Sequence, residues 1–422
     1  MSFQVDCPSL ASPIVKAAYP STSIGESSEQ IGRSAVSTRF VDFWLLGGAS
    51  IVLWAVMQVG QLFRDRSDMV DNHFVQVGAV FALMQIFCNY PHFIISYRFG
   101  YGRGGGFIRR HWFALVVVPL SMIAAYALAY LKFDYQLTDL AWVSAVNHVF
   151  ETAGLAFRLG TLDNMGTEIL SFSVLLMNMT VGWHYSKQVF GCVMAYAHYD
   201  RYSVSRVQRG VLKGSLFSVA FLNFFSLASF SSDSTSNPLG KAFFFSVPLI
   251  PLGLPKFLVP LTAATTASFA VAVIVEIFYR NYRSTGRLPS ANLIVPWLAF
   301  HVWWLPVWRQ SEYYLWAIPF FHSLQYLPFA YRLEEHNFKK SRWPALKKSA
   351  FLAGLLLVGF CAFELIPNIL DRTLETAWYL KTWFFTVAFI VFLNIHHFFI
   401  DSVVWKFDQK EVRAGLLGKS DS

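Results

Sequence analysis

Long apolar runs are the feature that most constrains the fold of this chain. Ten runs of about 18–24 residues consist mainly of apolar and aromatic side chains, and a helix of that length crosses a hydrocarbon core about 30 Å thick. A helix also satisfies its own backbone hydrogen bonds, which lipid cannot do. The sequence therefore predicts an all-α, polytopic integral membrane bundle of about ten transmembrane helices, at residues 41–62, 74–97, 112–131, 167–188, 213–231, 257–279, 292–308, 313–331, 349–366 and 383–404.

The positions of Lys and Arg predict the orientation of these helices. If the loops alternate between the two sides, starting with the N-terminus inside, 25 of the 34 basic residues lie inside and 9 outside. Such an excess marks the cytoplasmic side. We therefore expect both termini to be cytoplasmic, in a bacterial inner membrane or an equivalent membrane. The same bias explains the net charge of +9, so we expect no nucleic-acid partner.

The distribution of Ser, apolar and basic residues also predicts the domain organisation. Residues 1–40 are Ser-rich and are interpreted as a mobile cytoplasmic tail, residues 41–407 as the transmembrane domain and residues 408–422 as a second cytoplasmic tail. The basic segments 99–110 and 334–348 are expected to contact anionic lipid headgroups.

Two shorter apolar segments do not fit the pattern of full spans. Residues 138–160 are interrupted by His148 and Glu151, so we expect a helix lying at the outer surface. Residues 242–255 are short and Pro-rich, which favours a re-entrant or interfacial segment.

Histidines are concentrated inside the predicted spans. Six of the eleven lie there, each within nine residues of the predicted inner end of its span; they are His92, His184, His301, His322, His396 and His397. The other five lie in loops or at span ends and are interpreted as ordinary surface or interfacial residues. Ionisable residues inside a membrane are costly and are functional candidates by default.

Four spans place a His on a stripe of polar residues. The stripes are Gln85–Asn89–His92–Ser96, Thr180–His184–Gln188, His322–Gln325–Tyr326 and Asn394–His397–Asp401. Residues three or four apart lie on one face of a helix. A carboxylate or amide one turn from a metal-binding His is the arrangement that fixes the orientation and tautomer of its imidazole.

These stripes predict a metal site in the cytoplasmic half of the membrane. The expected metal-binding residues are His92, His184, His322, His396 and His397. Asp401, Tyr326 and His301 are candidate catalytic groups, Asp401 also being a candidate ligand, and Gln325 and Asn89 are expected to position the cofactor. Because metal–nitrogen bonds are about 2 Å long, the imidazoles of His92, His184, His322 and one of the His396–His397 pair should lie within about 10 Å of one another.

The leading functional hypothesis is a membrane metalloenzyme. Imidazole-rich sites suit iron, copper and zinc, and non-haem iron or copper would serve oxidative chemistry such as hydroxylation, desaturation or cleavage. The substrate would be a lipid or another apolar small molecule, with a redox partner or a second copy of the chain as expected partners. The dispersed His residues resemble the integral-membrane iron hydroxylases and desaturases. However, the chain has no His-x-x-x-His or His-x-x-His-His box, so no residue is assigned from that resemblance.

Three alternatives remain open at this stage. Haem b could lie between two spans and serve electron transfer. A transporter or proton relay could use the intramembrane His residues and Asp401. Finally, polar side chains also hold membrane helices together by hydrogen bonds, with no ligand involved.

Overall fold

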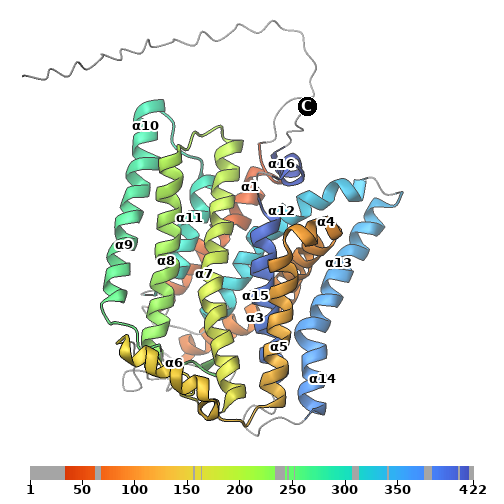
Figure 1. The fold of residues 1–422 in the computed structure, drawn as a ribbon. Helices are drawn as coiled ribbons and strands as arrows, with labels where there is room; N and C mark the ends of the chain where they lie inside the picture. The colour runs from red at the N-terminus through yellow and green to blue at the C-terminus, as the bar shows by residue number, and fades with distance from the viewer. Residues whose placement is uncertain are drawn as a thin grey trace, which may run out of the picture. The chain divides into compact units, whose positions relative to one another are not determined.

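The computed structural model describes most of the predicted transmembrane domain. The described residues are 34–61, 68–154, 157–162, 164–232, 243–244, 247–250, 252–306, 313–339, 342–374, 383–406 and 409–417. They form a bundle of long helices (Figure 1). Residues 1–33 of the predicted N-terminal tail lie outside the described part of the chain.

Helices account for nearly all of the regular structure. The N-terminal half contains α1 (Arg39–Phe43), a π-helical turn (Trp44–Gly48), α2 (Ala49–Gln61), α3 (Asp68–Tyr101), α4 (Gly105–Arg110), a π-helical turn (Phe113–Val117), α5 (Val118–Leu131), a 3₁₀ turn (Leu137–Asp139), α6 (Ala141–Thr152) and α7 (Met165–Tyr199). The C-terminal half contains α8 (Arg206–Ser232), β1 (Phe243–Phe244), β2 (Val247–Pro248), α9 (Leu258–Val273), a π-helical turn (Ile274–Tyr279), α10 (Arg280–Thr285), α11 (Ala291–Trp304), α12 (Tyr313–Lys339), α13 (Pro344–Phe360), a π-helical turn (Cys361–Leu365), α14 (Ile366–Thr373), α15 (Phe384–Val404) and α16 (Lys410–Leu417).

Eight of these helical segments are long and apolar enough to cross a membrane, counting only the described residues. This confirms the predicted all-α membrane bundle, whereas the predicted number of ten spans is not confirmed. The two other predicted spans correspond to α11 and α12. Helix α11 has only 14 residues, and the apolar sequence of the 27-residue α12 is interrupted by polar residues such as His322 and Gln325.

Both ends of the described chain lie at the same end of the bundle. The carbonyl of Arg39 in α1 accepts a hydrogen bond from Asn292 of α11, and Arg39 also pairs with Asp200, directly after α7. The hydroxyl of Tyr199, the last residue of α7, donates to the carbonyl of Leu416 in α16. Figure 1 shows α10 and α16 at this end and α6 and α14 at the other. The shared end agrees with the predicted topology, and its assignment to the cytoplasm stays a prediction.

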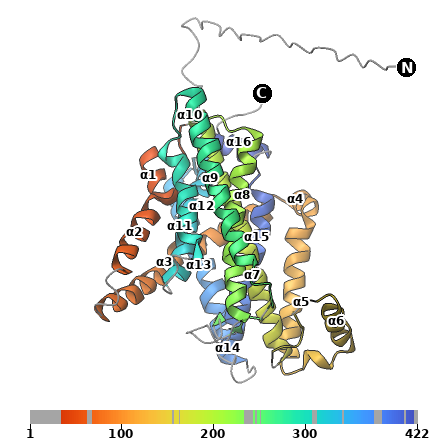
Figure 2. The ribbon, with the colours of Figure 1, turned by 90° about the vertical axis from the view of Figure 1, so that its left-hand side faces the viewer.

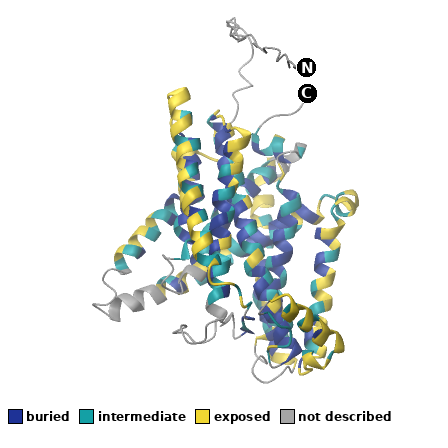
Figure 3. Cartoon of the chain, turned by 60° about the vertical axis from the view of Figure 1, so that its left-hand side comes forward, coloured by how far each residue is buried: buried dark blue, intermediate teal, exposed yellow. Residues whose placement is uncertain are grey.

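Burial separates central from peripheral helices. In the most apolar stretches of α7 and α15, 61% of the residues are buried by other parts of the protein. The corresponding share is 11% in the α9–α10 segment and 17% in the α13–α14 segment. The peripheral helices therefore offer most of their surface to lipid. Figure 3 shows the same division, with buried residues concentrated on the inner helices, and Figure 2 shows α9 and α10 along one side of the bundle.

Helices α3 and α12 pack side by side and run in the same direction. Polar contacts join Gln85 to Trp316, His92 to Ser323 and Ser96 to Tyr326 across this interface, and the offset in sequence stays at 231, 231 and 230 residues. A constant offset requires a parallel pair in fixed register. The polar stripe predicted on the second span thus faces α12 rather than lipid.

The segments outside the predicted spans are also packed. Helix α6 falls within residues 138–160 and lies at the α14 end of the bundle, with Val143 buried and Trp142 exposed (Figure 2). Within residues 242–255, β1 and β2 form a two-residue antiparallel pair. The predicted C-terminal tail contains α16, which is amphipathic and buries Val412 and Leu416.

Asp371 of α14 holds the start of α15. Its carboxylate accepts hydrogen bonds from the backbone N–H groups of Phe385 and Thr386, at 2.7 and 2.9 Å, and from the Thr386 hydroxyl at 2.7 Å. These two N–H groups belong to the first turn of α15, where no partner within the helix exists. Asp371 therefore caps α15 from a neighbouring helix.

The first prediction concerns topology. In a cysteine-labelling experiment, Asp139→Cys, near α6, should react with a membrane-impermeant maleimide in intact cells. Arg287→Cys, beyond α10, should react only after permeabilisation, because the basic end of the bundle is predicted to be cytoplasmic. The unmodified protein, with its own cysteines, serves as the labelling control. Labelling of both variants from the same side would contradict the topology.

The second prediction concerns the cap of α15. Asp371→Ala removes the acceptor of two N–H groups and one hydroxyl, and loss of a helix cap costs about 0.5–2 kcal/mol. We expect a lower melting temperature in detergent, and a smaller loss for Asp371→Asn, which retains one acceptor oxygen. Equal melting temperatures for all three proteins would show that α15 does not depend on this cap.

Candidate metal centre

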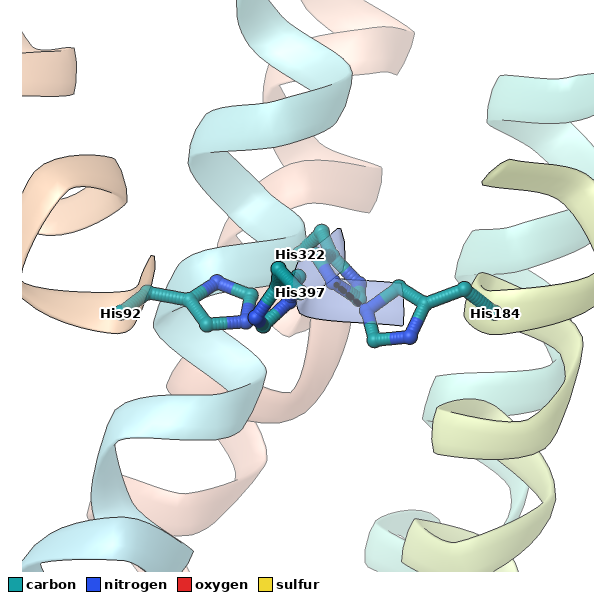
Figure 4. Close-up of side chains that lie close together, drawn as sticks. All are labelled: His92, His184, His322 and His397. Atoms are coloured by element: carbon teal, nitrogen blue, oxygen red, sulfur yellow. Dashed lines mark hydrogen bonds between the residues drawn. The ribbon is translucent and has the colours of Figure 1, made fainter. Parts of the chain in front are cut away.

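Four buried histidines from four different helices meet in the interior of the bundle. They are His92 of α3, His184 of α7, His322 of α12 and His397 of α15, and one ring nitrogen of each lies within 4.8 Å of the corresponding atoms of the others. In Figure 4, His92 and His184 approach from opposite sides, with His322 and His397 between them. The predicted convergence of His92, His184, His322 and one residue of the adjacent pair is confirmed. We refer to these four residues as the His cluster.

The hydrogen bonds around His92 define which of its ring nitrogens keeps a lone pair that could bind a metal ion. Its Nδ1 lies 2.9 Å from the hydroxyl of Ser323, which lies 2.9 Å from both the amide oxygen of Asn89 and the carbonyl of Pro319. Both oxygens are acceptors, so the Ser323 hydroxyl donates to one of them and accepts from His92. Nδ1 of His92 then carries the proton, and Nε2 keeps its lone pair.

Three ring nitrogens of the His cluster have no hydrogen-bond partner among the described residues. They are Nε2 of His92 and both Nδ1 and Nε2 of His397, all of them buried. A buried polar atom without a partner costs about 1–3 kcal/mol. Native proteins leave few such atoms, so each calls for an explanation such as an ion. Several unpartnered nitrogens on neighbouring imidazoles indicate a site for a positively charged ligand.

His184 and His322 face each other directly. Their Nε2 atoms are 3.0 Å apart, at hydrogen-bond distance. In neutral imidazoles one of the two nitrogens donates and the other accepts. With a metal ion between the rings, both Nε2 atoms would present lone pairs instead. The distance between the two Nε2 atoms therefore fits both a hydrogen-bonded, metal-free pair and a pair that binds an ion.

Aromatic rings clamp the imidazoles in place. Tyr185 stacks on His322 with ring centroids 3.6 Å apart and an interplanar angle of 9°, and Tyr326 stacks on His92 at 4.1 Å. Phe398 stacks on His184 at 4.6 Å. These contacts restrict ring rotation, which is the condition for a preorganised ligand set.

Asp401 of α15 lies beside the His cluster. Its Oδ2 is 3.6 Å from Nε2 of His397 and 4.0 Å from Nε2 of His184. Its Oδ1 accepts a hydrogen bond of 3.4 Å from the Tyr326 hydroxyl, which in turn accepts one from Nε1 of Trp405 at 3.0 Å. The carboxylate is therefore close enough to join the ligand set or to exchange a proton with a bound molecule.

The two candidate positioning residues make different contacts. Asn89 is one of the two possible acceptors of the Ser323 hydroxyl, which contacts His92. Gln325 donates to the carbonyl of Leu46 at 2.5 Å and joins α12 to the first π-helical turn. Neither Asn89 nor Gln325 forms a hydrogen bond with an imidazole of the His cluster in the described part of the chain.

His396 and His301 lie outside the His cluster. His396 points away from His397, and its two nitrogens lie 3.0 and 3.1 Å from the hydroxyls of Tyr97 and Tyr101. His301 contacts the hydroxyl of Ser215 and the carbonyl of Trp297, each at 2.9 Å. The rings of both residues are fully hydrogen-bonded, unlike those of His92 and His397.

A cavity of about 340 Å³ reaches the His cluster. His184, Asp401 and Tyr326 are among its lining residues, and His184 belongs to the His cluster. Most of the remaining wall is apolar and includes Phe217, Phe329, Phe398 and Trp405. A small molecule in this cavity would therefore contact both the His cluster and an aromatic wall.

Two supporting residues carried no separate signal in the sequence. Tyr185 and Ser323 directly follow His184 and His322 in the chain, so they are not one helical turn from either His. Tyr185 acts on His322 and Ser323 acts on His92, across helix interfaces. Only the packing of the helices reveals these pairings.

No protein-family model, curated protein or solved structure matches this chain. The function of the site therefore has to be inferred from its own geometry.

The third prediction concerns the support of His92. Ser323→Ala removes the acceptor that holds the proton on Nδ1, so Nε2 is no longer kept free as a ligand. Losing such a support typically costs 10–100-fold in metal affinity. We expect a loss of that size for added Zn²⁺, measured by chelator competition. Ser218→Ala is the matched control, because Ser218 is a buried serine whose hydroxyl donates to the Ser215 carbonyl within α8. Equal affinities for both variants would contradict the assigned role.

Proposed function

We propose that this protein is a membrane-embedded metalloenzyme whose His cluster binds a transition-metal ion. The observation that carries the proposal is the convergence of four buried imidazoles, two of which have unpartnered ring nitrogens. Helix–helix adhesion alone would leave each imidazole hydrogen-bonded to its neighbour. A metal ion would use the unpartnered lone pairs and offset the cost of burying them.

The spacing of the His cluster supports ligation of one ion. Because metal–nitrogen bonds are about 2.0–2.1 Å long, two nitrogens that bind one ion would lie at most about 4.2 Å apart. The largest separation in the His cluster is 4.8 Å, so the side chains need to move inward by only about half an ångström. Imidazole favours iron, copper, zinc and nickel over calcium and magnesium, which prefer oxygen ligands.

We further propose oxidative chemistry on a lipophilic substrate, with iron or copper as the metal. The support for this step is the cavity, since its apolar wall suits a hydrophobic molecule and its inner side meets His184 and Asp401. Bound iron or copper would supply redox chemistry there. Asp401, hydrogen-bonded by Tyr326, would accept or donate the proton that accompanies the reaction.

The geometry disfavours the haem alternative. A haem iron takes four equatorial bonds from the porphyrin and only one or two from protein. Four imidazole nitrogens within 4.8 Å of one another leave no plane for such a ring. A proton relay through the His cluster and Asp401 would need no metal. Measuring the metal content of the purified protein therefore distinguishes it from our proposal.

The fourth prediction compares variants of two histidines of the His cluster with variants of two histidines outside it, and adds a variant of Asp401. His397→Ala and His322→Ala should abolish stoichiometric metal binding, because each removes a ligand. His396→Ala and His301→Ala should retain it, because both rings are hydrogen-bonded elsewhere. Asp401→Asn should weaken metal binding or activity by about 10–100-fold. The measurements are elemental analysis and the absorbance spectrum of protein purified with added iron, copper or zinc.

Wild-type protein that stays metal-free after this treatment would overturn the proposal and favour the proton relay. A haem absorbance band would also overturn the proposal and would favour an electron-transfer function. If all four His variants lost metal equally, the result would reflect a general loss of fold. Melting temperatures measured in parallel distinguish that case from loss of a ligand.

A further inference from the structure

Two lysines stand on the wall of the cavity that reaches the His cluster. Lys187 of α7 and Lys213 of α8 both line it, and their ammonium groups lie over the rings of Trp183 and Phe190 at 4.2 and 4.8 Å. Both side chains are partly exposed, so the lysines mark the side of the cavity that opens outward. Their aliphatic stems lie along aromatic surface while their charges remain accessible.

The lysines outnumber the described acidic residues on the cavity wall. Neither lysine forms an ion pair with a described carboxylate. The like charges of Lys406 and Lys213 and the opposite charge of Asp401 all act on Lys187. Asp401 is the single acidic residue that lines the cavity, and it lies beside His184 and His397. The opening is therefore electropositive, and an anion bound there would relieve repulsion between the lysines.

The cationic opening and the His cluster are close together. Lys187 follows His184 by three residues on α7, which corresponds to about 4.5 Å along the helix axis. Aromatic side chains, including Trp183, Phe190 and Phe398, line the same cavity. A molecule held at the lysines would thus place its apolar part against the aromatic wall and next to the His cluster.

Size limits what the cavity can hold. Its volume of about 340 Å³ is near the lower end of the range of about 300–1,000 Å³ for small-molecule sites. This suits one acyl chain and not the two chains of a phospholipid. The lysines also lie at the predicted inner boundary of their spans, the depth at which the head group of a membrane amphiphile resides.

From this arrangement we propose that the cavity binds a single-chain amphiphile with an anionic head group, held by Lys187 and Lys213. This inference rests on the proposed function, because it names the substrate class of the same site. The shared chemistry is an oxyanion on an alkyl chain, and either a fatty-acid carboxylate or a monoalkyl phosphate provides it.

The experiment uses full-length protein in nanodiscs of phosphatidylcholine. Three photoreactive probes of equal chain length are compared, namely a diazirine-labelled palmitate, hexadecyl phosphate and hexadecanol. Labelled peptides are identified by mass spectrometry, and metal content is measured on the same samples. The variant is Lys187→Gln/Lys213→Gln. Lys348→Gln is the matched control, because its ammonium also lies over an aromatic ring, Tyr331, but outside the cavity.

We expect at least one anionic probe to label the cavity segments of α7 and α15, with at least tenfold weaker binding in the double variant and no change in Lys348→Gln. The anionic probe that labels identifies the head group as carboxylate or phosphate. Hexadecanol should bind at least tenfold more weakly and be insensitive to the lysines. Equal binding of hexadecanol, or full anion binding by the double variant, would overturn the proposal.

Metal content separates this inference from the proposed function. The double variant Lys187→Gln/Lys213→Gln and the control Lys348→Gln should bind as much metal as the wild type, because none of these lysines belongs to the His cluster. Lysine-dependent labelling of a metal-free wild type would support the amphiphile site and refute the metalloenzyme. A metal-loaded wild type that binds no anionic probe would refute the amphiphile site alone.

Discussion

The need to satisfy polar groups away from water governs this structure. An imidazole inside a membrane loses its hydrogen bonds to water, and each ring nitrogen must find a partner in the protein. His301 and His396 find theirs in hydroxyl and carbonyl groups, at distances of 2.9–3.1 Å. Nε2 of His92 and both ring nitrogens of His397 have no such partner among the described residues, even though both side chains are fully buried. The difference between these two pairs separates histidines that only join helices from histidines that could also bind an ion.

The same requirement organises the surrounding helices. The parallel contact of α3 and α12 brings Ser323 to His92 and Tyr326 to Ser96, so the polar groups of each helix supply partners for the other. Asp371 performs this role for the N-terminus of α15, which carries His397 and Asp401. In the peripheral α9, the exposed hydroxyls of Thr265 and Ser268 instead donate to carbonyls one turn back in the same helix, so they need no partner from another helix.

The sequence was sufficient to predict the membrane bundle and the convergence of His92, His184 and His322. Apolar length and helical periodicity are local properties, and a polar stripe on an apolar helix must face the interior. The sequence could not predict which of His396 and His397 joins the His cluster. Adjacent helix positions point about 100° apart, and only the packing of α15 decides which of the two faces the interior. For the same reason the roles of Ser323 and Tyr185 emerged only from contacts between helices that are far apart in sequence. The short α11 and the polar α12 also show that a helix inside a bundle need not meet the length and hydropathy of an isolated span.

The positions of the four histidines of the His cluster in the chain have a consequence for biosynthesis. His92, His184, His322 and His397 come from α3, α7, α12 and α15, so no two of them lie in consecutive helices, and the last belongs to the final long helix of the described chain. Chains are made from the N-terminus onward, at about 5–20 residues per second. The bundle therefore cannot complete its His cluster until α15 has left the ribosome. Any ion would enter a finished bundle rather than guide its assembly, and a prematurely terminated chain would insert its helices but lack the centre.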